Sequence, residues 1–118
     1  MVRAILVLAT VFSVASTSLA GDLVTPPLFV GASSTAACKL MNITSATIPA
    51  QIQMIQDGTV VGDTGPATLV ADGVRELLGF GPATVSCRFV KASKSKARGA
   101  LTRSSGGDGS DITVVAAE

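Results

Sequence analysis

The sequence predicts an all-β fold, a small sandwich of about seven or eight short antiparallel strands held by one disulfide. Three observations favour this fold. Residues 83–89 alternate, with Ala83, Val85, Cys87 and Phe89 on one side and polar side chains on the other, which is the period of a half-buried strand. Turn signals recur about every 8–12 residues, the spacing of short strands in a sandwich. The chain contains no long amphipathic helical pattern.

Residues 1–20 have the pattern of a secretory signal peptide, which leaves residues 21–118 as a single β-sandwich domain. Arg3 precedes an apolar run over residues 4–14, and Ser18-Leu19-Ala20 places small residues before a cleavage site. The run is shorter than the about 20 apolar residues that a bilayer crossing needs. We therefore expect a secreted or periplasmic protein with no membrane span after cleavage; an uncleaved anchor is the alternative.

The two cysteines of the chain, Cys38 and Cys87, lie far apart in the sequence. In an exported protein two cysteines most simply form one disulfide. Closing that loop would stabilise the fold by about 4 kcal/mol in the loop-entropy model. Two free thiols are the alternative.

The other strands are predicted from shorter patterns. Residues 48–56 alternate until Ile55 breaks the phase, which indicates either a bulge or the approach of the turn. Asp57-Gly58 is the strongest hairpin signal in the chain. Residues 74–78 fit a strand or a brief helix, and the lead-in at residues 21–27 contains Pro-Pro and cannot be helical. Further strands are expected at residues 28–30, 36–43, 59–61, 67–70, 97–102 and 112–116, with a loop at 104–111.

Composition excludes several functions. The chain has nine Lys and Arg against eight Asp and Glu, and this near-neutral balance argues against nucleic acid as a partner. It has no histidine, so neither a Ser-His-Asp nor a Cys-His arrangement can form within it. We therefore predict that the protein is not an enzyme, and we expect no cofactor and no metal.

One stretch of the chain is strongly basic and contains no acid. Its cations are Arg88, Lys91, Lys94, Lys96, Arg98 and Arg103. A functional interpretation is a contact surface for an anionic partner, such as acidic glycans, lipid headgroups or an acidic protein. Strand alternation places Arg88 and Lys91 on different faces, so the alternative is a set of solvated charges that protects a sheet edge.

Two short motifs have both a functional and a structural interpretation. Residues 106–111 fit the first six positions of a Gly-rich calcium-binding repeat, but Thr113 replaces the required apolar residue and only one copy is present. A hairpin loop is the other interpretation. Asn42-Ile43-Thr44 is a glycosylation sequon, and Asn42 could instead hydrogen-bond the turn at residues 44–47.

Several segments together resemble small exported bacterial proteins of unassigned function with an immunoglobulin-like or fibronectin-III-like sandwich. They are Cys38-Lys39-Leu40-Met41-Asn42, the alternating stretch 48–56 with Asp57-Gly58, Cys87-Arg88-Phe89, the Lys-Ser-Lys linker, and Arg98-Gly99-Ala100-Leu101. The resemblance covers most of residues 28–116. It implies the sandwich fold and brings no catalytic residues with it.

The sequence therefore predicts an exported, non-enzymatic binding or structural module whose partner is an unknown protein or an anionic surface. One alternative is an accessory or adhesin-like subunit of a surface assembly that pairs through a strand edge, with residues 28–30 as the contact. Another is an inhibitor or anion-binding protein that acts through the basic segment 88–103.

Overall fold

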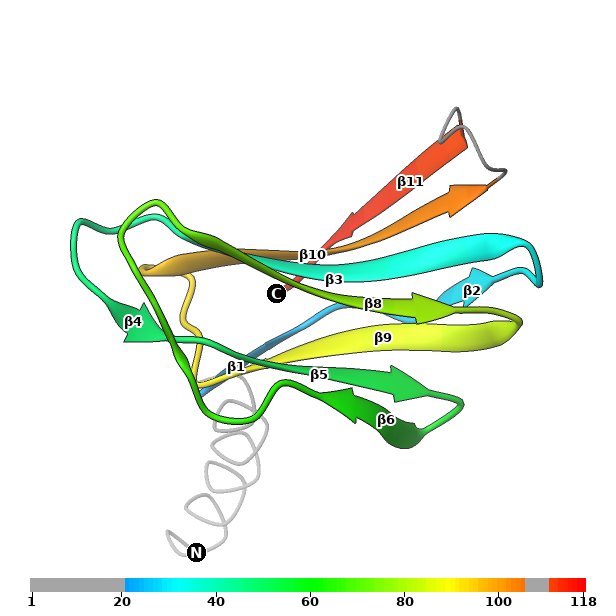
Figure 1. Ribbon diagram of the computed structural model, residues 1–118, viewed down its shortest axis with the longest axis horizontal. Helices are drawn as coiled ribbons and strands as arrows, with labels where there is room; N and C mark the ends of the chain where they lie inside the picture. Colours follow the sequence, from blue (N-terminus) through cyan, green and yellow to red (C-terminus); the bar gives the residue numbers. More distant parts are fainter. Residues whose placement is uncertain (1–20, 106–110) are drawn as a thin grey trace, which may run out of the picture.

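The computed structural model describes residues 21–105 and 111–118, and every regular element in that part of the chain is a β-strand. One sheet, sheet A, contains β1 (Asp22–Val24), β2 (Leu28–Val30), β5 (Gln51–Gln56), β6 (Thr59–Asp63) and β9 (Ala83–Val90). The other, sheet B, contains β3 (Ser34–Asn42), β8 (Val74–Phe80), β10 (Ala97–Ser105) and β11 (Asp111–Ala116). A small third sheet pairs β4 (Ile48–Pro49) with β7 (Thr68–Leu69). Figure 1 shows sheets A and B as two stacked layers, which confirms the predicted all-β sandwich.

The strand order follows from the antiparallel pairings. Sheet A has the order β1-β9-β5-β6, with β2 also paired to β9, and sheet B has the order β11-β10-β3-β8. The strand β9 is therefore central to sheet A, with β1 and β2 on one side and β5 on the other. Its side chains alternate as predicted, because Ala83, Val85, Cys87 and Phe89 are buried between the sheets.

The predicted disulfide is confirmed, and it joins the two sheets. Cys38 on β3 and Cys87 on β9 lie with their sulfur atoms 2.08 Å apart and their Cα atoms 5.7 Å apart. Both residues are fully buried. The crosslink therefore connects the middle strands of the sandwich through its core.

The core on either side of the disulfide is apolar and close-packed. Its largest fully buried side chains include Phe89, Leu40 and Ile52. Gly99 on β10 faces the Phe89 ring, and a Cβ atom at Gly99 would lie 2.6 Å from two ring carbons. The absence of a side chain at this position lets sheet B approach the ring directly.

The hairpin appears where the sequence predicted it. Asp57 and Gly58 join β5 to β6 with φ values of 50° and 86°, the left-handed pair that a type I′ turn requires. The β5–β6 register shifts between Met54 and Ile55, but β5 itself pairs with β9 without interruption, so Ile55 is an outward apolar residue and not a bulged one. The extra residue sits on β6, where Val61 has no pairing partner.

The boundaries of several strands differ from the prediction. The lead-in contains the unpredicted strand β1, which pairs with β9 and is also bonded to Glu118, so its formation depends on tertiary contacts. The stretch 48–56 divides at Ala50 into β4 and β5, which join different sheets. The brief helix considered at residues 74–78 is wrong, because these residues pair with β3 as part of β8. The described part contains eleven strands, because β1 is added and the stretch 48–56 contributes two strands. The strand β10 extends to Ser105, into the range where a loop was expected.

The predicted signal peptide at residues 1–20 and most of the Gly-rich loop, residues 106–110, lie outside the described residues. Within the described part, no helix is long and apolar enough to cross a membrane.

Candidate interaction surface

The basic segment does not form one patch. The strand β9 carries Arg88 on the outer face of sheet A, where its Nη1 donates to Gln53 Oε1 at 3.2 Å. The strand β10 carries Arg98 on the outer face of sheet B, where its guanidinium donates to the carbonyl oxygens of Lys94 and Ala97. These two cations therefore lie on opposite faces of the sandwich.

Arg103 holds three strands together. Its Nη1 donates to the carbonyl oxygen of Phe29 on β2 at 2.8 Å, and its Nη2 donates to Thr113 Oγ1 on β11 at 2.9 Å. Arg103 itself belongs to β10. Its guanidinium thus links the two sheets by hydrogen bonds. This structural role explains why an arginine stands here, and no external anionic partner is needed to explain it.

Only the three lysines of the segment share one loop, which connects β9 to β10. Lys91 has a positive φ of 60°, and its N–H donates to Asp22 Oδ1 at 3.0 Å. The Nζ atom of Lys94 lies 3.8 Å from Glu118 Oε1 in an exposed ion pair. Lys96 is exposed to solvent. The structure therefore brings together three of the six predicted cations.

The outer face of sheet A carries a polar, internally hydrogen-bonded cluster around Asp63, in addition to the exposed apolar side chains of Phe29 and Val60. Asp63 accepts hydrogen bonds from Gln51 Nε2 at 2.9 Å, from Gln53 Nε2 at 3.1 Å and from the N–H of Gly65 at 2.8 Å. These bonds, led by the one from Gln51, hold the pKa of the Asp63 carboxyl below its ordinary value. The hydrogen-bonding groups of this cluster largely satisfy one another.

The outer face of sheet B has the opposite character. Cross-strand pairing arranges its outward side chains in rows that run across β8, β3, β10 and β11 in that order. One row is Phe80, Thr35, Ser104 and Ile112, and the next is Leu78, Ala37, Thr102 and Val114. These two rows contain no charged side chain.

The two uncharged rows form a trough. The large side chains stand on the outer strands as walls, with Leu78 and Phe80 on β8 and Ile112 and Val114 on β11; their exposed fractions are 56%, 68%, 61% and 60%. The central strands β3 and β10 contribute only small residues to the floor, namely Thr35, Ala37, Thr102 and Ser104. A hollow of about 280 Å³ lies over this floor; of the wall residues, Leu78 and Ile112 line it, and it extends to Lys39 and Glu76 in the next row. Clustered exposed apolar side chains make this surface a candidate for contact with another molecule.

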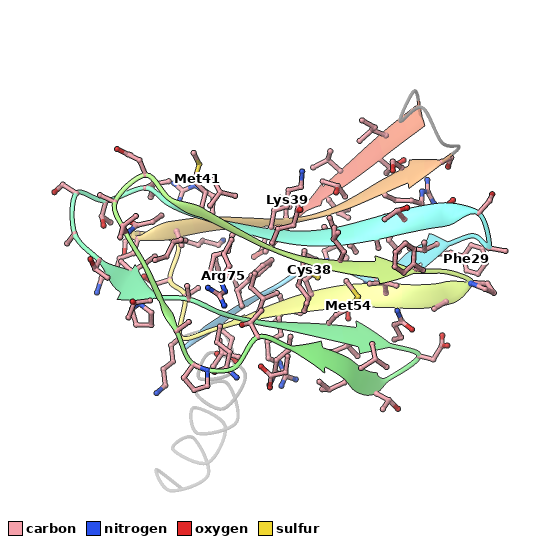
Figure 2. All side chains as sticks on the ribbon, in the orientation of Figure 1. Phe29, Cys38, Lys39, Met41, Met54 and Arg75 are labelled. Atoms are coloured by element: carbon pink, nitrogen blue, oxygen red, sulfur yellow. A yellow bond between two sulfur atoms is a disulfide. The ribbon has the colours of Figure 1, made fainter. Side chains whose placement is uncertain are left out.

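The next row of outward side chains on sheet B, the third, contains an acid and a lysine side by side, Glu76 on β8 and Lys39 on β3. Lys39 Nζ lies 3.4 Å from Glu76 Oε2, and both side chains remain substantially exposed. Figure 2 shows Lys39 and Met41 on the side of sheet B that faces away from sheet A. The ion pair therefore borders one end of the trough and leaves two charges available to a partner.

The strand β8 lies at an edge of sheet B and is open to strand pairing, whereas the predicted edge at Leu28–Val30 is partly occupied. The carbonyl oxygen of Phe29 in β2 accepts the Arg103 bond, and β1 exchanges two backbone bonds with Glu118 at its own edge. The Asn42 N–H donates to the Gly73 carbonyl, and the Gly81 N–H donates to the Ser34 carbonyl. In an antiparallel pair every second residue bonds the neighbouring strand, so these two bonds fix which residues of β8 bond β3. Val74, Glu76, Leu78 and Phe80 consequently direct their backbone groups away from the sheet, although the Phe80 carbonyl is also 3.5 Å from Gln56 Nε2.

Arg75 carries a charge on the inward side of the same edge strand. Figure 2 shows Arg75 between the two layers. Its Nε is buried and has no hydrogen-bond partner among the described residues. An inward-pointing charge on an edge strand is a device that discourages pairing with another strand. The outer face of sheet B is therefore a stronger candidate than the β8 edge.

The sequon asparagine is a buried structural residue. Asn42 is fully buried, and its Nδ2 donates to the carbonyl oxygens of Ala46, Leu69 and Val70 at 2.7, 3.0 and 3.0 Å. Its Oδ1 accepts from the N–H and the Oγ1 of Thr44, both at 2.8 Å. Every hydrogen-bonding position of the amide is used, so the folded protein does not present this nitrogen for glycosylation.

The described residues contain no group of three or more His, Cys, Asp or Glu side chains that could hold a metal ion. The calcium interpretation of the loop at residues 106–111 falls almost wholly on residues outside that part of the chain.

Comparisons with known proteins show a shared fold. No protein-family model and no curated protein matches the sequence. The structure is similar to one titled "Crystal Structure of Thermotoga maritima 1070", with a TM-score of 0.58 and 12% sequence identity. The match covers 84% of this chain and 93% of the Thermotoga maritima chain. At this identity the likeness establishes the architecture alone.

Proposed function

We propose that this protein is an exported, non-enzymatic binding module whose contact surface is the outer face of sheet B. The observation that carries the proposal is the contrast between the two outer faces. Sheet A presents a hydrogen-bonded polar cluster and two separate exposed apolar side chains, Phe29 and Val60, whereas sheet B gathers four large, exposed apolar side chains beside a hollow that Leu78 and Ile112 line. Exposed apolar walls cost solvation free energy in a free monomer, and they are typical of surfaces that bind another protein.

Export is part of the proposal. The predicted signal peptide at residues 1–20, with residues 21–118 as the mature domain, agrees with the buried disulfide, because such bonds persist in oxidising compartments. We also propose the resemblance to small exported bacterial proteins with an immunoglobulin-like sandwich, and its support is the two-layered all-β fold together with the disulfide.

Strand-edge pairing through β8 is the second candidate function. The outward backbone groups of Val74, Glu76 and Leu78 favour it, since an added strand from a surface assembly could pair with them. The inward charge of Arg75 opposes it. We therefore rank the face above the edge.

The test uses two exposed phenylalanines as a matched pair, Phe80 in the trough wall of sheet B and Phe29 in sheet A. In the compartment that receives the exported chain, we expect wild type and Phe29→Asp to migrate in a complex larger than the free chain on native size separation. Phe80→Asp should migrate as the free chain, because a carboxylate replaces an apolar contact. The proposal is wrong if the three proteins migrate alike.

A further inference from the structure

We propose that the trough on sheet B binds a second copy of this chain, so that two copies pack face to face about a twofold axis that runs along the strands. The inference rests on the proposed function, because it names the partner of the same surface. Each copy would place its β8 wall, Leu78 and Phe80, in the trough of the other. The surface therefore has to be complementary to itself in shape, in position and in charge.

The shape fits because large side chains meet small ones. In the outermost row, Phe80 of the second copy would lie over Thr35 and Ser104. In the next row, Leu78 of the second copy would lie over Ala37 and Thr102. A cavity of roughly 150 Å³ accepts a benzene ring. The hollow of about 280 Å³ therefore has room for the Phe80 ring together with part of a neighbouring side chain.

The position fits because a single twofold axis can place the β8 wall of each copy over the trough of the other. Neighbouring strands lie about 4.8 Å apart, so β8 stands about 7 Å from the midline between β3 and β10. A twofold axis parallel to the strands and halfway across that distance moves each β8 onto the midline of the other trough. Rotation about this axis does not change the position along the strands, so each row faces the same row of the other copy. Every contact between the uncharged rows is therefore made once by each copy.

The charges fit under the same axis. In the third row, Glu76 of the second copy falls beside Lys39 of the first, and Lys39 of the second copy falls beside Glu76 of the first. Across this row the four charges stand in the order Glu76, Lys39 of the second copy, Lys39, and Glu76 of the second copy. Each lysine thus gains a glutamate of the other copy, and the two lysines lie next to each other between the two glutamates. Four contacts between opposite charges therefore surround one contact between like charges.

The first test is sedimentation equilibrium of the purified mature chain over about 10 µM to 1 mM, a range that detects weak dimers. We expect a concentration-dependent monomer–dimer equilibrium for wild type. Phe80→Asp should raise the dissociation constant by about tenfold or more, and the matched control Phe29→Asp should change it by less than about twofold. A wild type that stays monomeric throughout, or equal weakening by the two substitutions, overturns the inference.

The second test uses charge reversal and mixing. Lys39→Glu leaves a copy with two carboxylates in this row, and Glu76→Lys leaves a copy with two ammonium groups. Each variant alone should dimerise at least about tenfold more weakly than wild type, and an equimolar mixture should recover heterodimers. A purely structural role for the ion pair predicts no recovery on mixing. Absence of recovery, with both variants folded by circular dichroism, contradicts the inference.

The inference and the proposed function can fail separately. A chain that is monomeric when pure but migrates in a Phe80-dependent complex after export binds a different protein. That outcome keeps the proposed function and rejects the second copy as the occupant.

Discussion

Replacing both cysteines with alanine should lower the free energy of unfolding by about 4 kcal/mol, as measured by urea denaturation of the mature chain. The Cys38–Cys87 bond closes a loop across a sequence separation of 49 residues, and the loss of this constraint raises the entropy of the unfolded chain. Small domains have a net stability of about 5–15 kcal/mol, so this change removes a large share of it.

The control for the disulfide prediction is wild-type protein unfolded with and without reductant. Reduction should reproduce most of the loss, because it releases the same constraint without deleting the sulfur atoms. If the free energy of unfolding of the double-alanine variant falls by less than about 1 kcal/mol, noncovalent contacts between β3 and β9 are sufficient to hold the two sheets together. In that case the disulfide would not be the main covalent support of the sandwich.

Asn42→Asp should lower the free energy of unfolding at pH 7 by about 3 kcal/mol or more. The substitution keeps the shape of the side chain but removes the two N–H groups that serve the carbonyl oxygens of Ala46, Leu69 and Val70. It also places a carboxylate against these oxygens in a fully buried site, which is strongly unfavourable.

The pH dependence of this variant separates burial of charge from loss of shape. Burial and the facing carbonyl oxygens should raise the pKa of the new carboxyl in the folded state above its unfolded value of about 3.9. The destabilisation should therefore be smallest below about pH 4 and grow as the pH rises towards 7. Gln56→Glu is a suitable control, because the Gln56 amide makes only contacts of 3.5 and 3.9 Å. A loss that is equal at pH 4 and pH 7 contradicts this account of Asn42.

The parts of the fold that sequence reasoning predicted are those with strong local signals. Alternation over residues 83–89 defined β9, the Asp57-Gly58 turn defined the β5–β6 hairpin, and the two cysteines defined the crosslink between the sheets. The strand β1 was missed although β2, of equal length, was predicted, because β1 contains only two apolar residues and β2 is apolar throughout. It forms through pairing with β9 and through the two backbone bonds to Glu118, which no local pattern reveals.

The candidate surface was harder to predict than the fold, because it is assembled from four strands. The basic segment is contiguous in the sequence, but alternation and strand pairing send Arg88 and Arg98 to opposite faces. The trough has the reverse property, since its walls come from β8 and β11, and its floor comes from β3 and β10. Only the register shows that Leu78 and Val114 stand at the two ends of one row. The available signal was the alternation in β8 and β11, where apolar residues recur on the side that the core does not use.

A photo-crosslinking scan of the exported protein in its native compartment tests most directly whether the outer face of sheet B is the binding surface. A photoreactive side chain is placed singly at positions 78, 80, 112 and 114 on sheet B, and at positions 29, 55, 60 and 84 on sheet A. The account predicts adducts from the sheet B positions, with a mass that identifies either a second copy or another protein, and none above background from sheet A. Adducts that come equally from both faces, or only from sheet A, would contradict it.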